Sequence, residues 1–233
     1  LDRPRPDPRP PVTGDVRADL LVVGGGLTGL WAAVRARQEM PDLDVVLIEG
    51  ESIGSGASGR NGGFMSSSLV HGIGNGLARF PGEVAKLEEL GLENLAAIKS
   101  SVEAAGIECD LTSPGAVETA MTGHQFEELG EAVGELEQYG HAAELLDEEA
   151  MRSQLDSPLF TGGLWQKSGE CLIDPVKLCD GLARLAEDRL PGHIAQDDVV
   201  GRLSCQPCDV ADRVACFLFV GDRHAGGFAG FFL

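Results

Sequence analysis

The residues "DLLVVGGGLTGLWAA", 19–33, carry the strongest indication of a fold in this chain. Four apolar residues lead into a run of glycines, and a second apolar run follows. Gly24, Gly26 and Gly29 satisfy the pattern G-x-G-x-x-G between a predicted strand and a predicted helix. The first glycine permits a tight turn, the second lets the backbone approach a pyrophosphate, and the third lets the helix pack closely on the strand. The pattern predicts a dinucleotide site, although an ordinary strand-to-helix loop also fits it.

A β-α-β unit surrounds these glycines. The helix predicted over residues 27–40 ends before Pro41, because proline cannot continue a helix interior. A second strand, "DVVLIE" at residues 44–49, completes the unit and ends in Glu49. An acidic side chain about 20 residues after the glycines accepts hydrogen bonds from ribose hydroxyls and repels a 2′-phosphate. The unit therefore predicts an adenine dinucleotide without a 2′-phosphate.

The segment after Glu49 favours FAD over NAD. It reads "SIGSGASGRNGGFMSSS", residues 52–68, and is rich in glycine and serine. Such small residues let the backbone pass close to the ribityl and ring end of a flavin and supply hydrogen-bond donors. An NAD-binding unit usually continues into an ordinary loop and helix at this point. A flexible surface loop is the alternative interpretation.

Two stretches resemble one family. The run "GGGLTGLWAA", Glu49 and "GASGRNGG" are similar to the FAD-dependent amine oxidoreductases of the D-amino-acid oxidase type, which include sarcosine and glycine oxidases and γ-glutamylputrescine oxidoreductase. The run "GGLWQKSGECLIDPVKLCDGLARLA", residues 162–186, is similar to the later signature of that family. The resemblance runs from about residue 19 to about residue 203. It implies FAD as cofactor and an amine or amino acid as substrate, with hydride passing to the flavin and oxygen usually reoxidising it.

The candidate site residues come from these motifs. Arg60 and Asn61 are candidates for contacts with flavin or phosphate oxygens, since arginine suits bidentate anion recognition; solvation of the loop is the alternative. His71 is the one candidate for a catalytic base, because it follows the same loop. We recognise no metal-ligand cluster. The predicted cofactor-binding set is Gly24, Gly26, Thr28, Gly29, Glu49, Ala57, Ser58, Arg60, Asn61, Gly62 and Gly63.

Composition excludes several classes of partner. The chain has 233 residues, of which 43% are hydrophobic, and a formal net charge of −19. This charge argues against nucleic acid, because little could neutralise a run of phosphates, and against an anionic membrane surface. No apolar run is long enough to span a bilayer, and no signal segment is recognisable. The 6 cysteines lack the density of a disulfide scaffold. We expect a cytoplasmic protein with reduced thiols.

The predicted fold class is α/β, with a Rossmann-like FAD-binding parallel sheet and a partial α+β substrate portion. Helices that begin near Leu27, Glu83 and Asp174 are expected to pack on the sheet, and an acidic amphipathic helix is predicted within residues 127–149. The expected segments are a Pro-rich leader (1–17), the FAD-binding core with its following helix (18–106), a partial substrate portion (107–170), a return to the FAD-binding domain (171–203) and an aberrant tail (204–233).

The tail differs from the rest of the chain. It holds 3 of the 6 cysteines, and 5 of the 9 phenylalanines follow residue 216. A fragment, a premature stop or a shifted reading frame would each produce such a tail, so we expect C-terminal truncation, loose FAD binding and impaired turnover. Cys205 and Cys208 form a lone C-x-x-C that we interpret as two unpaired thiols. A non-catalytic dinucleotide-binding remnant is the alternative function, and an NAD-dependent dehydrogenase is a weaker one.

Overall fold

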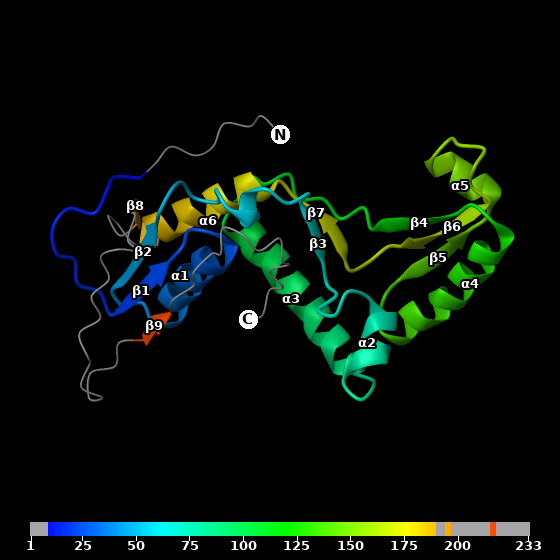
Figure 1. Ribbon diagram of the computed structural model, residues 1–233, viewed down its shortest axis with the longest axis horizontal. Coiled ribbons are helices and arrows are strands. Elements are labelled where there is room, and N and C mark those ends of the chain that lie inside the picture. Colours follow the sequence, from blue (N-terminus) through cyan, green and yellow to red (C-terminus); the bar gives the residue numbers. More distant parts are fainter. Residues whose placement is uncertain (1–8, 190–193, 197–214, 218–233) are drawn as a thin grey trace. The chain divides into compact units, whose positions relative to one another are not determined.

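The computed structural model describes residues 9–189, 194–196 and 215–217 (Figure 1). Contacts divide the chain into two units. Unit 1 comprises Leu1–Gly62, Ala105–Asp110 and Asp174–Leu233, and unit 2 comprises Gly63–Ala104 and Leu111–Ile173. Both units are therefore assembled from segments that are distant in the sequence.

A four-stranded parallel sheet forms the centre of unit 1, in the order β8-β2-β1-β9. Leu20 lies opposite Val45, and Val23 lies opposite Ile48, as the β-α-β pattern predicts. One further strand comes from the expected return to the FAD-binding domain and another from the tail. The strands are β1 (Leu20–Val23), β2 (Val45–Glu49), β8 (Ile194–Gln196) and β9 (Ala215–Phe217).

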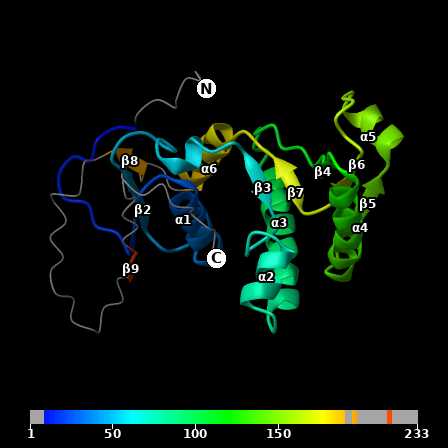
Figure 2. The same cartoon turned by 45° about the vertical axis from the view of Figure 1, so that its right-hand side comes forward.

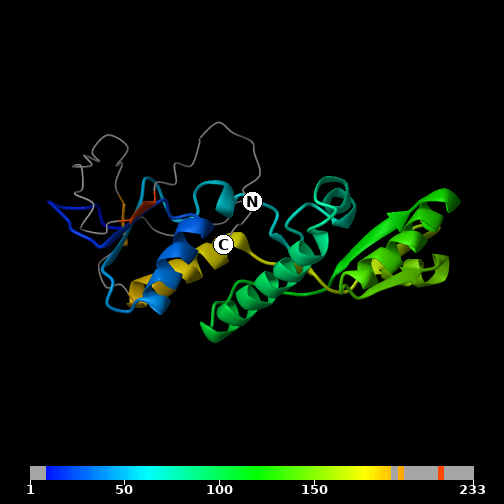
Figure 3. The same ribbon diagram turned by 90° about the horizontal axis from the view of Figure 1, so that it is seen from below.

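Two helices pack with this sheet in unit 1. They are α1, Leu27–Glu39, and α6, Pro175–Arg189, and they contact each other (Figure 3). The core between them buries Leu30 of α1 and Leu182 of α6 completely. The first four residues of β2 are also buried, which is typical of a parallel strand covered on both faces. The predicted α/β class is confirmed.

Helix α6 begins where the Asp-Pro pair predicts. Asp174 Oδ1 accepts hydrogen bonds from the backbone N–H groups of Val176 (3.0 Å) and Lys177 (3.2 Å). These bonds satisfy donors that have no partner within the helix, and Pro175 needs none at the first position. The helix start is thus defined by side-chain and backbone chemistry that is local in the sequence.

The described part of the leader, residues 9–17, forms neither helix nor strand. Arg9 nevertheless attaches it to α6, because its Nε lies 2.7 Å from Glu187 Oε1 and its guanidinium lies 3.7 Å from Asp180. Among the described residues, no helix combines the length and the apolar character needed to cross a bilayer.

Unit 2 contains an antiparallel sheet in the order β4-β6-β5 (Figure 2). A Cβ atom on Gly162 would collide with the Phe126 ring, whereas one on Gly163 would lie 2.9 Å from Met151 Sδ. Consecutive strand residues face opposite sides, so α4 and α5 cover opposite faces. The elements are β4 (Ala116–Ala120), α4 (Gly123–Gln138), β5 (Ala143–Leu146), α5 (Glu148–Gln154) and β6 (Gly162–Gln166).

The prediction of an acidic helix within residues 127–149 is wrong for the second half of that range. Helix α4 ends at Gln138, and Gly140 follows with a φ of +86°. Leu145, which falls within the range of the predicted helix, lies in β5 opposite Leu164 of β6. The acids after residue 140 belong to a strand and a second helix, because pairing with β6 overrides the local pattern.

The helix predicted near Glu83 also requires a correction. It forms as α3, Val84–Ala104, but contacts assign it to unit 2 and not to the unit of the parallel sheet. Gly91 of α3 lies so close to the carbonyl oxygen of Ser67 that a Cβ atom would collide with it, and Val84 lies close to Gly76. The remaining elements of unit 2 are β3 (Phe64–Ser66), α2 (Ile73–Arg79) and β7 (Glu170–Leu172), which pairs antiparallel with β3.

The expected return to the first unit is shifted by a few residues. The sequence predicts it at residue 171, whereas contacts place it at Asp174, after β7. Of the described cysteines, Cys109, Cys171 and Cys179 are buried. Cys205, Cys208 and most of the predicted tail lie outside the described residues.

Candidate cofactor site

The glycine turn joins β1 to α1. Gly24 adopts a φ of +105°, a conformation that favours glycine, and its N–H donates to the carbonyl of Ile48 at 2.8 Å. A Cβ atom on Gly29 would collide with the carbonyl oxygen of Gly24. The helix therefore packs against the turn so closely that a side chain at this position does not fit.

Glu49 lies beside this turn at the end of β2. Its Oε2 accepts a hydrogen bond from the Gly25 N–H at 2.6 Å, and its Oε1 accepts one from the Glu51 N–H at 2.9 Å. Each carboxylate oxygen has two lone pairs, so each retains the capacity to accept another donor. The half-buried carboxylate is thus held in place by the backbone and can still bind a hydroxyl group.

The Gly/Ser segment folds back onto the turn. The Gly54 N–H donates to the carbonyl of Gly25 at 3.0 Å, and Ser58 Oγ accepts a hydrogen bond from the Leu27 N–H at 3.0 Å. Ser58 belongs to a short 3-10 helix, η1, Ala57–Gly59. Because the N-cap of α1 is Gly26, which has no side chain, Ser58 supplies the cap from a distant part of the chain.

Asn61 and Arg60 follow η1 directly. Asn61 Nδ2 donates to the carbonyls of Ala57 (3.2 Å) and Ser58 (2.8 Å), so this amide stabilises the turn itself. Arg60 and Thr28 are exposed, Thr28 in the first turn of α1. Contacts of these three residues with FAD remain predictions.

The structure brings together most of the predicted set in unit 1. Gly24, Gly26, Gly29, Glu49 and Ser58 form one arrangement around the start of α1. Gly62 also belongs to unit 1, whereas Gly63 and His71 belong to unit 2. His71 is exposed and has a φ of 59°.

Gly25 lies in the turn but is not among the predicted cofactor-binding residues. A Cβ atom here would lie 2.5 Å from Ile53 Cδ1, and its N–H is the donor that orients Glu49. The motif G-x-G allows any residue at its middle position and therefore does not single out Gly25. The run of three glycines at residues 24–26 is the signal that could have indicated it. Glu88 and His141 of unit 2, which form a buried pair, were also missed.

This arrangement fits the ADP half of FAD. The first turn of α1 carries no acidic residue that would oppose an anion at the positive end of the helix. Ser58 Oγ accepts from Leu27, and its own hydrogen can be donated to a phosphate oxygen. Glu49, at the end of β2 beside the turn, offers a carboxylate that can accept hydrogen bonds from ribose hydroxyl groups. The residues present therefore suit a pyrophosphate and an unphosphorylated ribose.

Comparisons with known proteins point to one family. A family model described as FAD dependent oxidoreductase (DAO) matches residues 19–213, ten residues beyond the expected end near 203. γ-Glutamylputrescine oxidoreductase of Escherichia coli (strain K12) is 35% identical over 170 residues. That match covers 72% of this chain and 39% of the relative, so the chain spans well under half the length of this relative.

Solved structures show the same fold. Glycine oxidase from Geobacillus kaustophilus superposes with a TM-score of 0.62 at 18% identity, over 77% of this chain and 46% of that chain. L-α-Glycerophosphate oxidase from Mycoplasma pneumoniae, solved with FAD bound, gives a TM-score of 0.59 at 17% identity, over 77% and 44%. The family model matches most of the length of this chain. The chain therefore belongs to the DAO family of FAD-dependent oxidoreductases.

Proposed function

We propose that this chain is the cofactor-binding part of a flavoenzyme that oxidises the C–N bond of an amine or amino acid. The hydrogen bond from the Gly25 N–H to Glu49 Oε2, at 2.6 Å, carries the proposal, because it fixes the ribose-binding carboxylate beside the phosphate turn. The similarity to γ-glutamylputrescine oxidoreductase and to glycine oxidase supports a small amine or amino acid as substrate.

The residues of unit 1 have separate tasks in this proposal. The N–H groups at the start of α1 bind the pyrophosphate, and Ser58 orients them by capping Leu27. Glu49 binds the ribose hydroxyls. FAD, when bound, supplies the hydride acceptor, while the protein positions the substrate and excludes water. His71 remains the candidate base.

The chain spans 39% of its E. coli relative, so it could bind the cofactor without turning over a substrate. The test therefore measures cofactor binding and turnover separately. The purified chain is loaded with excess FAD, desalted, and examined for retained flavin absorbance. Glycine, sarcosine and γ-glutamylputrescine are then added without oxygen. Bleaching of the bound flavin by one of these amines supports the proposal.

The other outcomes are equally informative. Flavin that stays bound and that no amine reduces favours the non-catalytic remnant, with the dinucleotide site intact. Absence of retained flavin, combined with binding of NADH to the same preparation, would overturn the proposal and favour a dehydrogenase.

A further inference from the structure

The protein contains two Asn-Gly pairs, Asn61-Gly62 in unit 1 and Asn75-Gly76 in unit 2. Such a pair is chemically labile, because glycine has no side chain to keep its backbone nitrogen away from the amide carbon, Cγ, of the preceding asparagine. Attack of that nitrogen on Cγ is intramolecular and is therefore favoured by proximity. Its rate depends on what else holds the nitrogen and the asparagine side chain, and the two pairs differ in both respects.

The backbone nitrogen of Gly62 is free to attack. Asn61 and Gly62 are both exposed and follow η1 outside any helix or strand. Within the described part of the chain, the Gly62 N–H donates no hydrogen bond to the protein. No backbone hydrogen bond therefore has to break before this nitrogen acts as a nucleophile.

The side chain of Asn61 is attached to a weak element. Its Nδ2 donates to the carbonyls of Ala57 (3.2 Å) and Ser58 (2.8 Å), both in η1. This element is a single 3-10 turn, and the Gly59 N–H lies as far as 3.3 Å from the carbonyl oxygen of Gly56. A short turn with long hydrogen bonds opens at little cost in free energy. Each opening releases the Asn61 amide.

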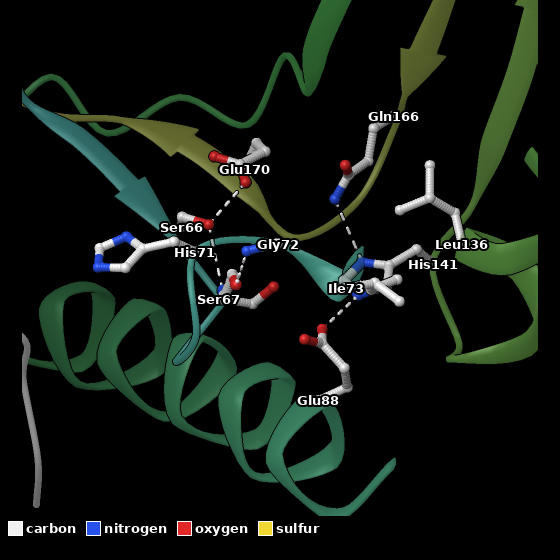
Figure 4. A pocket seen from close by; sticks show the side chains of 11 residues that line it. Ser66, Ser67, His71, Gly72, Ile73, Glu88, Leu136, His141, Gln166 and Glu170 are labelled. Atoms are coloured by element: carbon white, nitrogen blue, oxygen red, sulfur yellow. Dashed lines mark hydrogen bonds and ion pairs between the residues drawn. The ribbon is translucent and has the colours of Figure 1, made fainter. Parts of the chain in front are cut away.

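The second pair is protected by regular structure. Asn75 and Gly76 lie inside α2, where the Gly76 N–H donates to the carbonyl of Gly72 at 3.1 Å. The Gly72 N–H, drawn in Figure 4, donates in turn to Ser68 Oγ at 2.7 Å. Gly76 is buried, and a Cβ atom on it would lie 2.8 Å from Val84 Cγ2 of α3. Attack by Gly76 would require α2 to unwind, so this pair is an internal control with the same dipeptide.

We propose that Asn61 deamidates spontaneously in the folded protein and that the product loosens the turn at the start of α1. The Gly62 nitrogen forms a bond to Asn61 Cγ while the Cγ–Nδ2 bond breaks, and Nδ2 leaves as ammonia with the proton of the Gly62 N–H. Water then opens the resulting cyclic imide at one of its two carbonyl carbons, which gives aspartate or isoaspartate. One water is consumed, one ammonia is released, and no oxidant or reductant takes part.

The product changes the contacts of η1. A carboxylate cannot donate, so the bonds to the carbonyls of Ala57 and Ser58 are lost, and like-charged oxygen atoms face one another. Because Ser58 Oγ accepts from the Leu27 N–H, the loss extends to the cap of α1. The new negative charge also opposes an anion at this end of the helix. This effect on FAD rests on the proposed function, whereas the modification itself does not.

Ageing of the purified, FAD-free chain at neutral pH, followed by peptide mass spectrometry, tests the modification. We expect Asn61 to be converted at least about tenfold faster than Asn75, because its neighbour needs no helix opening. Conversion at Asn61 should accelerate in mildly alkaline buffer, since the attacking nitrogen must lose its proton. Methylation by an isoaspartyl methyltransferase identifies the isoaspartate. Gly62→Ala should slow conversion at Asn61 and leave conversion at Asn75 unchanged. Equal rates at the two sites, or no conversion at Asn61, would overturn the proposal.

Urea denaturation of Asn61→Asp tests the effect on the turn, because this variant has one of the two products in place from the start. We expect it to unfold at a lower urea concentration than the wild type. Asn94→Asp, the same change on α3 at a side chain without a hydrogen bond in the described part of the chain, is the matched control and should unfold with the wild type. Equal midpoints of Asn61→Asp and the wild type would contradict the loosened turn.

Titration with ADP separates this proposal from the proposed function. Freshly purified chain should bind ADP, and Asn61→Asp should bind it about threefold more weakly. If fresh chain binds neither ADP nor FAD, the proposed function fails, while conversion at Asn61 in the aged chain still supports the deamidation site. If fresh chain binds ADP and Asn61 is not converted on ageing, the deamidation site is refuted and the proposed function stands.

Discussion

Ser58 caps a helix that begins 31 residues earlier, since its Oγ accepts a hydrogen bond from the Leu27 N–H at 3.0 Å. The bond connects the Gly/Ser segment to the end of α1 that we propose binds the pyrophosphate. A change in either segment should therefore affect both the stability of α1 and the binding of FAD.

Ser58→Ala tests this connection. Loss of a capping oxygen leaves the Leu27 N–H without its side-chain partner, and we expect the free energy of unfolding to fall by about 1 kcal/mol. FAD affinity should fall as well. Urea denaturation and fluorescence titration with FAD measure the two effects. Ser100→Ala, at an exposed position within α3, should not destabilise the protein; equal effects of the two variants would contradict the capping role.

Gly29→Ala should disrupt the glycine turn. The new Cβ atom would collide with the backbone oxygen of Gly24, which cannot move without changing the turn, so we expect a loss of about 2 kcal/mol of stability and of FAD binding. Gly134→Ala is the matched control in an exposed helix interior, where nothing lies within 4 Å of the new atom. It should raise stability by about 0.5 to 1 kcal/mol. Thermal unfolding of both variants gives the comparison.

Glu49→Gln should weaken the binding of ADP and FAD about tenfold, because a charged acceptor for ribose hydroxyls becomes a neutral one. The amide nitrogen also cannot accept, so one of the bonds from Gly25 and Glu51 is lost. Isothermal titration with ADP measures the change. Glu51→Gln alters an exposed side chain beside the site and serves as control; similar losses in both variants would argue against ribose binding by Glu49.

Cys179 should be unreactive in the folded protein. Burial, with a smaller contribution from the charge of Asp180, raises the pKa of its thiol to about 12. The thiolate is the reactive form, so almost none is present at neutral pH. Iodoacetamide labelling followed by peptide mass spectrometry should modify Cys179 after denaturation and leave it unmodified before. Rapid labelling of the native protein would contradict this expectation.

The same thiol makes stability depend on pH. In the unfolded chain the pKa of Cys179 returns towards 9.0, whereas the folded state keeps the proton up to about pH 12. Its contribution to stability is therefore complete below pH 9 and is lost as the pH rises towards 12. Melting temperatures of the wild type and Cys179→Ala across this range measure it. The variant should show a shallower decline, and parallel curves would contradict the assignment.

The predictable parts of the fold are those that depend on neighbouring residues. The end of α1 before Pro41, the start of α6 at Asp174 and the glycine turn follow from short-range chemistry, and all three form as predicted. The parallel pairing of β1 with β2 also follows, because a crossover helix of this length places the two strands side by side.

The errors arise where distant residues decide the outcome. The spacing of apolar residues in α3 shows that one face is buried but does not show against which unit it packs. Leu145 joins a strand because β6 lies beside it. In unit 2, the buried partners Glu88 and His141 are 53 residues apart, and no local pattern connects them. Their pairing becomes visible only in three dimensions.

The interrupted construction of unit 1 has a consequence for synthesis of the chain on the ribosome. Strand β2 acquires its neighbour β8, and α1 acquires its neighbour α6, only after all of unit 2 has been translated. Until then the nascent sheet has an open edge at β2, and such edges invite pairing with other chains. Pairing across so long a separation is also slow. We expect early nascent intermediates to be prime clients of chaperones that shield exposed strands.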